Sequence, residues 1–166
     1  MNTVYMNSLA MNVFGNLPEV GKKAPNFHLV AQDLSEVTLD SFKGSRLVLN
    51  IFPSLDTAVC AASVRKFNER VAKMENTKVV CVSMDLPFAA TRFCTANGIE
   101  NVSTASGFRS RFGDEYGVRI EDGPLKDLYA RAVVIIDENG IVKGISMREQ
   151  ITEEPDYDFV EAALKV

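Results

Sequence analysis

Cys60 has the clearest chemical setting of any residue in this chain. It closes the segment PSLDTAVC (residues 53–60), which leaves an apolar run and enters an amphipathic helix predicted to extend to about Met74. Asp56 or Thr57 is a suitable N-cap, which places Cys60 in or beside the first helical turn. Free N–H groups and the helix dipole favour an anion there, so the nucleophilic thiolate is stabilised over the thiol. One helix end supplies only about 0.3–1 kcal/mol, up to about 2, so a reactive thiolate also needs a second cation or donor.

A structural interpretation of Cys60 fits the same spacing. The cysteine begins a row of apolar residues at helical intervals, opposite a charged row of Arg65, Lys66, Glu69, Arg70 and Lys73. The apolar row is Cys60, Val64, Phe67, Val71 and Met74. Free cysteines often pack as small hydrophobic residues, so spacing alone leaves both interpretations open.

The remaining candidate residues are less distinctive. Cys81 stands among valines in a predicted buried strand and is interpreted as structural. Cys94 lies near the end of a predicted helix, where the dipole disfavours a thiolate and the terminal turn can fray. Arg131, taken alone, is an arginine at the end of a strand. The sole histidine, His28, is interpreted as an ordinary strand residue, and a single histidine argues against a His-rich metal site or a Cys–His protease.

Composition limits the classes of protein that the chain can represent. With 166 residues and 46% hydrophobic content, residues 1–166 are expected to form a single domain around one core. A net charge of −4 offers no basic surface for nucleic acid or anionic membranes, and the apolar runs are too short for a membrane span. The N-terminus has no basic region followed by a continuous apolar run, so a secretory signal is not expected, and three cysteines argue against a disulfide scaffold. We therefore expect a cytoplasmic location.

The positions of the predicted elements suggest a fold. Strands are expected in an N-terminal hairpin (3–14) and at 27–30, 37–39, 47–52, 78–84, 101–106, 131–137 and 141–146. Helices are expected from Cys60 to Met74, at 85–97 and 108–116, and from Pro155 onward, with a loop at 118–128. A βαβα unit followed by a β-hairpin and a helix is typical of the thioredoxin-like fold, in which helices flank a central mixed β-sheet.

Several motifs, read in order, make the chain resemble the peroxiredoxin family. Pro53-x-x-x-Thr57-x-x-Cys60 matches the family signature. The longer stretches resemble the thiol peroxidase branch: NIFPSLDT (50–57), VCAASVRKFN (59–68), DLPFA (85–89), RFC (92–94), DGPLK (122–126), ARAVV (130–134) and EPDY (154–157). Together they span nearly the whole chain.

The resemblance implies a peroxidase that reduces hydrogen peroxide and organic hydroperoxides without metal, haem or flavin. Cys60 is then the peroxidatic thiolate that becomes a sulfenic acid, and Cys94 is the resolving cysteine that forms an intrachain disulfide with it. Thr57 is expected to hydrogen-bond the thiolate and the peroxide, Pro53 to shield the intermediate, and Arg131 to supply the cation. Thioredoxin is the implied reductant, and a homodimer the implied assembly.

Two other functions remain possible at this point. A glutaredoxin-like thiol oxidoreductase is disfavoured, because Cys60-Ala61-Ala62-Ser63 lacks the second cysteine of a Cys-x-x-Cys motif. A redox sensor that signals through a Cys60–Cys94 disulfide is compatible with the same residues.

Overall fold

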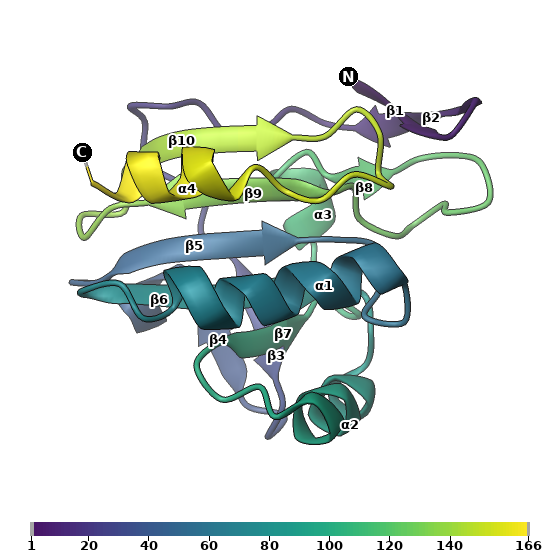
Figure 1. Cartoon of the computed structure of the whole chain (residues 1–166). Coiled ribbons are helices and arrows are strands. Elements are labelled where there is room, and N and C mark those ends of the chain that lie inside the picture. The colour runs from purple at the N-terminus through teal and green to yellow at the C-terminus, as the bar shows by residue number, and fades with distance from the viewer. Residues whose placement is uncertain (1, 166) are drawn as a thin grey trace.

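The computed structural model describes residues 2–165, and its centre is a seven-stranded mixed β-sheet (Figure 1). The strand order in this sheet is β10-β9-β5-β6-β7-β3-β4, and a separate three-stranded sheet has the order β1-β2-β8. β5, β6 and β7 are parallel, whereas β9, β10, β3 and β4 join antiparallel. The predicted fold class, a mixed sheet flanked by helices with an N-terminal hairpin, is confirmed.

The elements have the following bounds. The strands are β1 (Asn2–Met6), β2 (Leu9–Phe14), β3 (His28–Ala31), β4 (Glu36–Thr38), β5 (Arg46–Ile51), β6 (Thr77–Ser83), β7 (Ser103–Ser106), β8 (Arg119–Ile120), β9 (Ala132–Ile136) and β10 (Val142–Met147). The helices are the 3-10 helix η1 (Leu39–Phe42), α1 (Ala58–Lys66), the π-helical turn η2 (Phe67–Val71), α2 (Pro87–Asn97), α3 (Phe112–Glu115) and α4 (Tyr157–Leu164).

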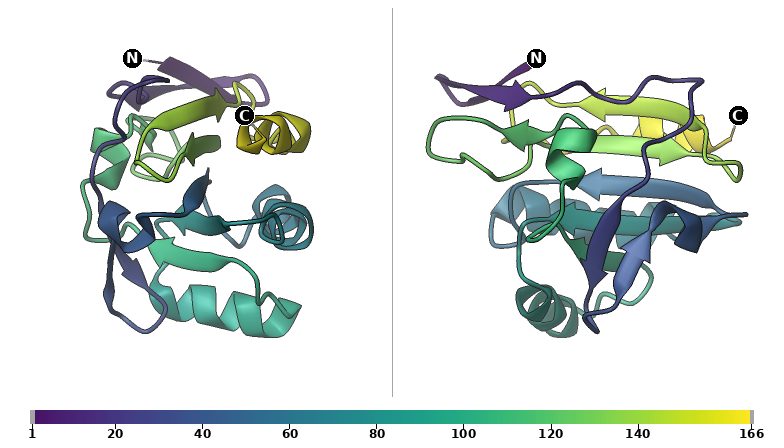
Figure 2. Two further views of the ribbon diagram at one scale, coloured as in Figure 1. Left: turned by 90° about the vertical axis from the view of Figure 1, so that its left-hand side faces the viewer. Right: turned by 180° about the vertical axis from the view of Figure 1, so that it is seen from behind.

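Helices cover both faces of the large sheet. Figure 2 shows α1, α2 and α4 on one face, with α3 and η1 on the other. β5 is buried on both faces because it lies at the centre of the sheet. Leu47, Leu49 and Ile51 pack in the cluster that contains Phe112 of α3, whereas Val48 packs in the cluster that contains the core face of α1. This two-sided burial explains why β5 is a continuous apolar run broken only by Asn50.

Three predicted elements differ from the structure. The helix expected to reach Met74 is regular only to Lys66 and continues as the wider turn η2 to Val71, which keeps Phe67 and Val71 buried. The helix expected at 108–116 is only α3, because the Ser110 side chain accepts from the Phe112 N–H and the preceding residues form turns.

The segment expected to be a loop at 118–128 contains β8, which pairs with β2 through Val13 and Ile120. Two strand residues are too few to show a period of two in the sequence.

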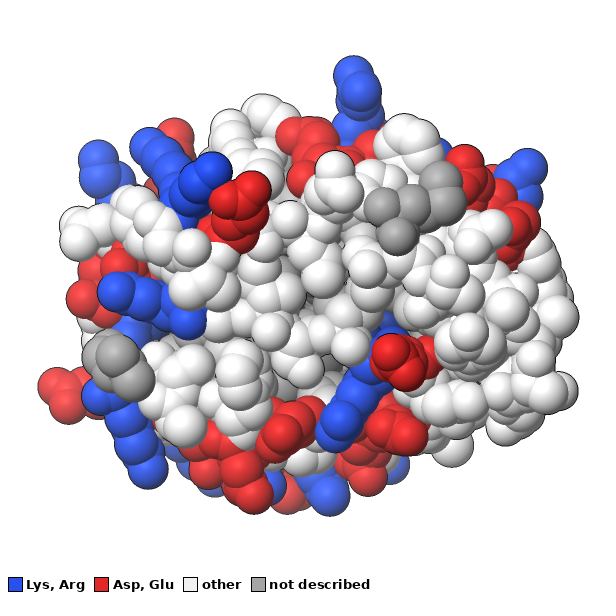
Figure 3. Space-filling model, turned by 90° about the horizontal axis from the view of Figure 1, so that it is seen from above, with Lys and Arg blue, Asp and Glu red and all other residues white. Residues whose placement is uncertain are grey.

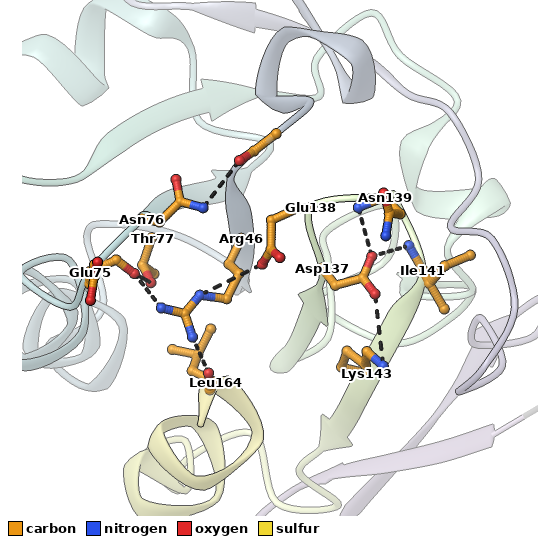
Figure 4. A network of polar contacts seen from close by, with 11 residues as sticks. Arg46, Glu75, Asn76, Thr77, Asp137, Glu138, Asn139, Ile141, Lys143 and Leu164 are labelled. Carbon is orange, nitrogen blue, oxygen red and sulfur yellow. Dashed lines mark hydrogen bonds and ion pairs between the residues drawn. The ribbon is translucent and has the colours of Figure 1, made fainter. Parts of the chain in front are cut away.

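A polar network anchors the end of the sheet where β5 begins (Figure 4). The Arg46 guanidinium donates to the backbone carbonyls of Glu75 and Leu164, and its Nε lies 3.9 Å from a Glu138 carboxylate oxygen. These contacts join the start of β6, the end of α4 and the β9–β10 turn. The start of β5 is therefore fixed by these contacts, and the strand leads from there to the Cys60 loop.

The molecular surface carries no concentrated positive charge on the face seen from above. Figure 3 shows Lys and Arg interspersed with Asp and Glu around the rim, and uncharged side chains over much of this face. This distribution agrees with the net charge of −4. Within residues 2–165, no helix has the length and hydropathy of a membrane span.

Candidate active site

Cys60 lies in the first turn of α1, and Thr57 is the residue that caps this helix. Thr57 has extended backbone angles, and its Oγ1 accepts from the Cys60 N–H at 3.4 Å. The Cys60 side chain is fully buried on the same face as Val64, Phe67 and Val71. The helical spacing therefore did identify a core face, and Cys60 occupies its first position, beside the loop that follows β5.

Arg131 brings a positive charge to this buried sulfur. Its Nη2 donates to Cys60 Sγ at 3.1 Å, and its Nε donates to the Ile151 carbonyl at 2.8 Å. Cys60 and Arg131 are far apart in the sequence, and strand pairing brings them together. β9 runs antiparallel to β5, with Ala132 opposite Ile51. Arg131 directly precedes β9 and so lies beside the end of β5, where the Cys60 loop begins.

The electrostatics of Arg131 favour a thiolate partner. The residue is only 2% exposed, and a guanidinium does not lose its proton in proteins. A buried cation is costly unless an anion or several acceptors face it. Among residues 2–165, no carboxylate lies within ion-pair distance of Arg131, so Cys60 Sγ is the contact that can carry the balancing charge.

Pro53 and Thr57 lie in the same loop as Cys60, with different exposures. Pro53 is buried and follows the end of β5, whereas Thr57 is exposed. The Thr57 hydroxyl donates to the Ser54 carbonyl at 3.1 Å, so its proton is directed into the loop and not at Cys60 Sγ. In this state Thr57 orders the turn, and a contact with a peroxide would require its hydroxyl to rotate.

An apolar cavity of about 190 Å³ opens beside the loop and the helix start that carry Cys60, whereas Cys60 itself is fully buried and does not line it. Arg131 is its one charged lining residue, and Ser54, Thr57 and Thr152 are its polar ones. The apolar lining is formed by Met6, Pro53, Val59, Leu125, Leu128 and Ile151. The Nη1 atom of Arg131 is buried and has no hydrogen-bond partner within residues 2–165, so one nitrogen of this cation is unpaired.

Cys94 lies on α2 in a different environment. It is 7% exposed, and its Sγ accepts from Gln32 Nε2 at 3.6 Å. Burial raises the pKa of the Cys94 thiol, although the Gln32 donor acts in the opposite direction. Cys94 lines a polar groove with Gln32, Thr95 and Thr104, and it does not line the cavity beside Cys60. All three cysteines are free thiols here, and Cys60 and Cys94 have different hydrogen-bond partners, Arg131 and Gln32.

Cys81 lies in buried β6, as the run of valines predicted. Burial raises the pKa of its thiol to about 12, so the sulfur stays protonated at neutral pH. Asn50 Nδ2 donates to Cys81 Sγ at 3.6 Å. The residue lines neither the Cys60 cavity nor the Cys94 groove.

A buried polar pair supports the first turn of α1 and was not identified from the sequence. Asn50 Nδ2 donates to Ser63 Oγ at 3.2 Å, and Ser63 Oγ donates to the Cys60 carbonyl at 2.8 Å. Both side chains are fully buried. The sequence does contain a signal for this pair, because Asn50 and Ser63 are polar residues in otherwise apolar surroundings. Buried polar groups are usually hydrogen-bonded, so a contact between two of them could have been expected.

Asp85 is a second residue that sequence analysis did not single out. Its carboxylate accepts from the Ser54 hydroxyl and from the Leu55 N–H, each at 2.8 Å. The signal was its position at the end of β6, which neighbours β5 in the sheet. No group of three or more His, Cys, Asp or Glu side chains within residues 2–165 is arranged to hold a metal ion.

Comparison with known proteins places this geometry in a family. The Redoxin family model matches residues 19–160. The chain is 55% identical over 150 residues to a thiol peroxidase of Corynebacterium glutamicum, covering 90% of this chain and 91% of that one. It is 49% identical over 164 residues to a thiol peroxidase of Mycobacterium tuberculosis, covering 99% of both.

Solved structures agree with this placement. A peroxiredoxin-like protein from Aquifex aeolicus superposes with a TM-score of 0.90 at 44% identity, covering 98% of this chain and 94% of that one. A thiol peroxidase from Chromobacterium violaceum has a TM-score of 0.91 at 23% identity, with 98% and 95% covered, and supports the fold alone. The chain therefore belongs to the redoxin, or peroxiredoxin, family and to its thiol peroxidase branch.

Proposed function

We propose that this protein is a thiol-dependent peroxidase that reduces hydrogen peroxide and organic hydroperoxides and is recycled by thioredoxin. The observation that carries the proposal is the 3.1 Å contact between Cys60 Sγ and the Nη2 atom of Arg131, a residue that lines an apolar cavity. A buried thiolate beside a permanent cation is a nucleophile that water does not solvate fully. The names of the relatives, thiol peroxidase, support the same activity.

The first proposed step is attack of the Cys60 thiolate on one oxygen of the hydroperoxide. An S–O bond forms and the O–O bond breaks, which gives a sulfenic acid on Cys60 and an alkoxide, or hydroxide when the substrate is hydrogen peroxide. That anion takes up the equivalent of the proton released when the Cys60 thiol ionised, and it leaves as the alcohol or as water. Negative charge develops on the leaving oxygen. The unpartnered Nη1 of Arg131 is the donor available to stabilise that charge, and Pro53 shields the sulfenic acid.

The second proposed step is resolution by Cys94. Its sulfur attacks the Cys60 sulfur, an S–S bond forms, and the S–O bond breaks so that hydroxide and the thiol proton leave as water. A disulfide needs Cα atoms within about 7 Å, whereas in the reduced protein the Cys60 thiol contacts Arg131 and the Cys94 thiol contacts Gln32. We therefore propose that the first turn of α1 and part of α2 open before the disulfide forms.

The third proposed step returns the enzyme to its dithiol form. Thioredoxin supplies two electrons and two protons as a dithiol, reduces the Cys60–Cys94 disulfide and becomes a disulfide itself. This cycle requires a compartment in which thioredoxin is kept reduced, so we propose that the enzyme acts in the cytoplasm. We also propose that the chain acts as a single domain.

We also propose that two copies form a homodimer. Three large apolar side chains, Leu86, Phe88 and Phe108, are exposed, and Phe88 is 67% exposed. They follow β6 and β7, which are neighbours in the sheet, and exposed apolar groups of this kind mark contact surfaces. Sedimentation of the wild type and of Phe88→Arg tests this assembly, which a monomeric wild type would exclude.

Peroxide consumption coupled to thioredoxin tests the activity. The wild type should turn over many equivalents of peroxide per Cys60 while thioredoxin reductase oxidises its nicotinamide cofactor. Cys60→Ser should show no consumption above the uncatalysed rate. Oxidation of a single stoichiometric equivalent, without further turnover, would favour the sensor function instead.

A further inference from the structure

We infer that Asp85 is a positioning residue that couples the Cys60 loop to the Cys94 helix, so that the two segments open together. The inference rests on the proposed peroxidase cycle, in which both segments must move. It assigns to one carboxylate the control over how long Cys60 stays in the geometry that reacts with peroxide.

The Asp85 side chain fixes the loop before Cys60. Oδ1 accepts from the Ser54 hydroxyl at 2.8 Å, and Oδ2 accepts from the Leu55 N–H at 2.8 Å. Ser54 continues the connection, because its carbonyl accepts from the Thr57 hydroxyl at 3.1 Å. Thr57 in turn caps the helix at the Cys60 N–H. A chain of hydrogen bonds therefore leads from Asp85 to the backbone of Cys60.

The Asp85 backbone fixes the start of the other segment. Asp85 precedes α2 by two residues, and its N–H donates to Ser83 Oγ at 3.3 Å. The Ser83 hydroxyl donates to Asp85 Oδ2 at 2.6 Å, which holds the carboxylate against the end of β6. Leu86 at the N-cap provides no side-chain hydrogen bond, so the placement of α2 depends on this turn. Cys94 lies on the same helix.

The physical consequence is coupling between the two openings. Hydrogen bonds to a charged acceptor are about twice as strong as neutral ones, and a half-buried carboxylate that loses its donors is destabilised. Opening the loop removes two donors from Asp85, and moving α2 carries Asp85 away from them. Either movement alone breaks the same contacts, so the second movement then costs less. Without the carboxylate, the segments should open independently and more often.

Hydrogen exchange on the reduced protein, without peroxide, tests the coupling directly. In Asp85→Ala, amide exchange should accelerate about 10- to 100-fold in both residues 54–60 and 87–97. Acceleration confined to residues 54–57 would overturn the coupling, as would no acceleration. Asp137→Ala is the matched control, because that carboxylate accepts from two backbone N–H groups in the β9–β10 turn and contacts neither segment.

Asp85→Asn separates a positioning role from a general loss of stability. An asparagine can place its oxygen toward the Leu55 N–H and Ser83, and its nitrogen toward Ser54 Oγ, which can also accept. It keeps the geometry with weaker, neutral hydrogen bonds, so it should show roughly half of the Asp85→Ala effect on a logarithmic scale. An effect as large as that of Asp85→Ala would contradict the positioning role. Ser54→Ala removes one contact, leaves Asp85 in place and should accelerate exchange in both segments.

Kinetics provide a readout that depends on the proposed function. At a fixed excess of peroxide, Asp85→Ala should oxidise Cys60 more slowly but form the disulfide faster, which lowers the sulfinic fraction measured by mass spectrometry about tenfold. A parallel loss of both rates would indicate damage to the site and overturn the inference. If the wild type consumes no peroxide, the proposed function fails, whereas the exchange experiment still decides whether the segments are coupled.

Discussion

The Nη2 atom of Arg131 lies 3.1 Å from the Sγ atom of Cys60, and the Nε atom of the same guanidinium is held by the Ile151 carbonyl at 2.8 Å. The cation is thus aimed by the backbone and does not depend on a flexible partner. Two of its nitrogens are used in this way, and the third, Nη1, is buried without a hydrogen-bond partner within residues 2–165. In the proposed mechanism, Nη2 contacts the nucleophile and Nη1 is left to stabilise the leaving oxygen.

Arg131→Ala should reduce the second-order rate constant for peroxide by about 10²–10³, the usual loss for one donor directed at developing charge. Alkylation of Cys60 at neutral pH should be slower in the same variant, because the sulfur loses the guanidinium that contacts it. Arg131→Lys should restore only part of the rate, because a lysine lacks the fork that contacts Ile151 and Cys60 together. Stopped-flow oxidation measures the rate. Arg109→Ala is the control, since Arg109 stacks on Phe108 and lines a cavity with His28. Unchanged rates of peroxide oxidation and alkylation in Arg131→Ala would contradict the proposed role of Arg131.

The three cysteines should differ in the step that they affect. Cys60→Ser should abolish peroxide reduction, whereas Cys94→Ser should allow one oxidation and block recycling by thioredoxin. Cys81→Ser should retain most of the turnover, because Cys81 contacts neither pocket. Intact mass after one equivalent of peroxide identifies sulfenic acid or disulfide in each variant. A loss of turnover in Cys81→Ser comparable with that in Cys94→Ser would contradict this assignment.

The apolar cavity should favour bulky apolar hydroperoxides. Leu128→Ala should lower kcat/KM for cumene hydroperoxide roughly tenfold, since apolar contact area with the substrate is lost. The value for hydrogen peroxide, which is too small to reach the apolar wall, should stay unchanged. Leu34→Ala is the control, because Leu34 is exposed and does not line this cavity. Equal losses for both peroxides would show that Leu128 supports the site and does not select the substrate.

Oxidation to the disulfide should loosen both segments that carry the reacting cysteines. Amides in 57–60 and 85–97 should exchange faster in the oxidised protein than in the reduced protein, because the helical turns there must unwind for the sulfurs to meet. Strands β5 and β6 should stay protected in both states, since both are buried at the centre of the sheet. Equal protection of the two segments in both states would mean that the thiols meet without opening.

Cys81 should contribute a pH dependence to stability. Its pKa is about 12 in the folded protein against an ordinary 9.0, so the unfolded chain loses this proton first as pH rises. The folded state then binds more protons, and the free energy of unfolding falls above about pH 9 by up to about 1.4 kcal/mol per pH unit. Cys81→Ala should show a flatter decline from about pH 8 to 10.5 in urea titrations under reducing conditions. A constant offset between parallel curves would contradict the pKa assignment.

Local patterns predicted much of the fold because the corresponding interactions are local. The apolar run of β5, the Thr57 N-cap and the Gly98 C-cap of α2 each depend on neighbouring residues, and each is found where it was expected within a residue or two. Gly98 has φ 63°, the left-handed conformation that ends a helix. An element that depends on a distant partner was predicted poorly: β8 exists because Val13 pairs with Ile120. The helix expected at 108–116 was wrong for a local reason, since a turn at Ser110 shortens it to α3.

The sequence alone determined which residue could act as a nucleophile, because Pro53, Thr57 and Cys60 lie within one strand-to-helix turn. It also supplied the motifs that resemble the peroxiredoxin family. The tertiary structure decided what surrounds that sulfur. The antiparallel pairing of β9 with β5 brings Arg131 to Cys60, and the parallel neighbour β6 brings Asp85 to Ser54 and Leu55. Spacing along the chain encodes none of these contacts, because strand order and register in a sheet are set by packing of the whole core.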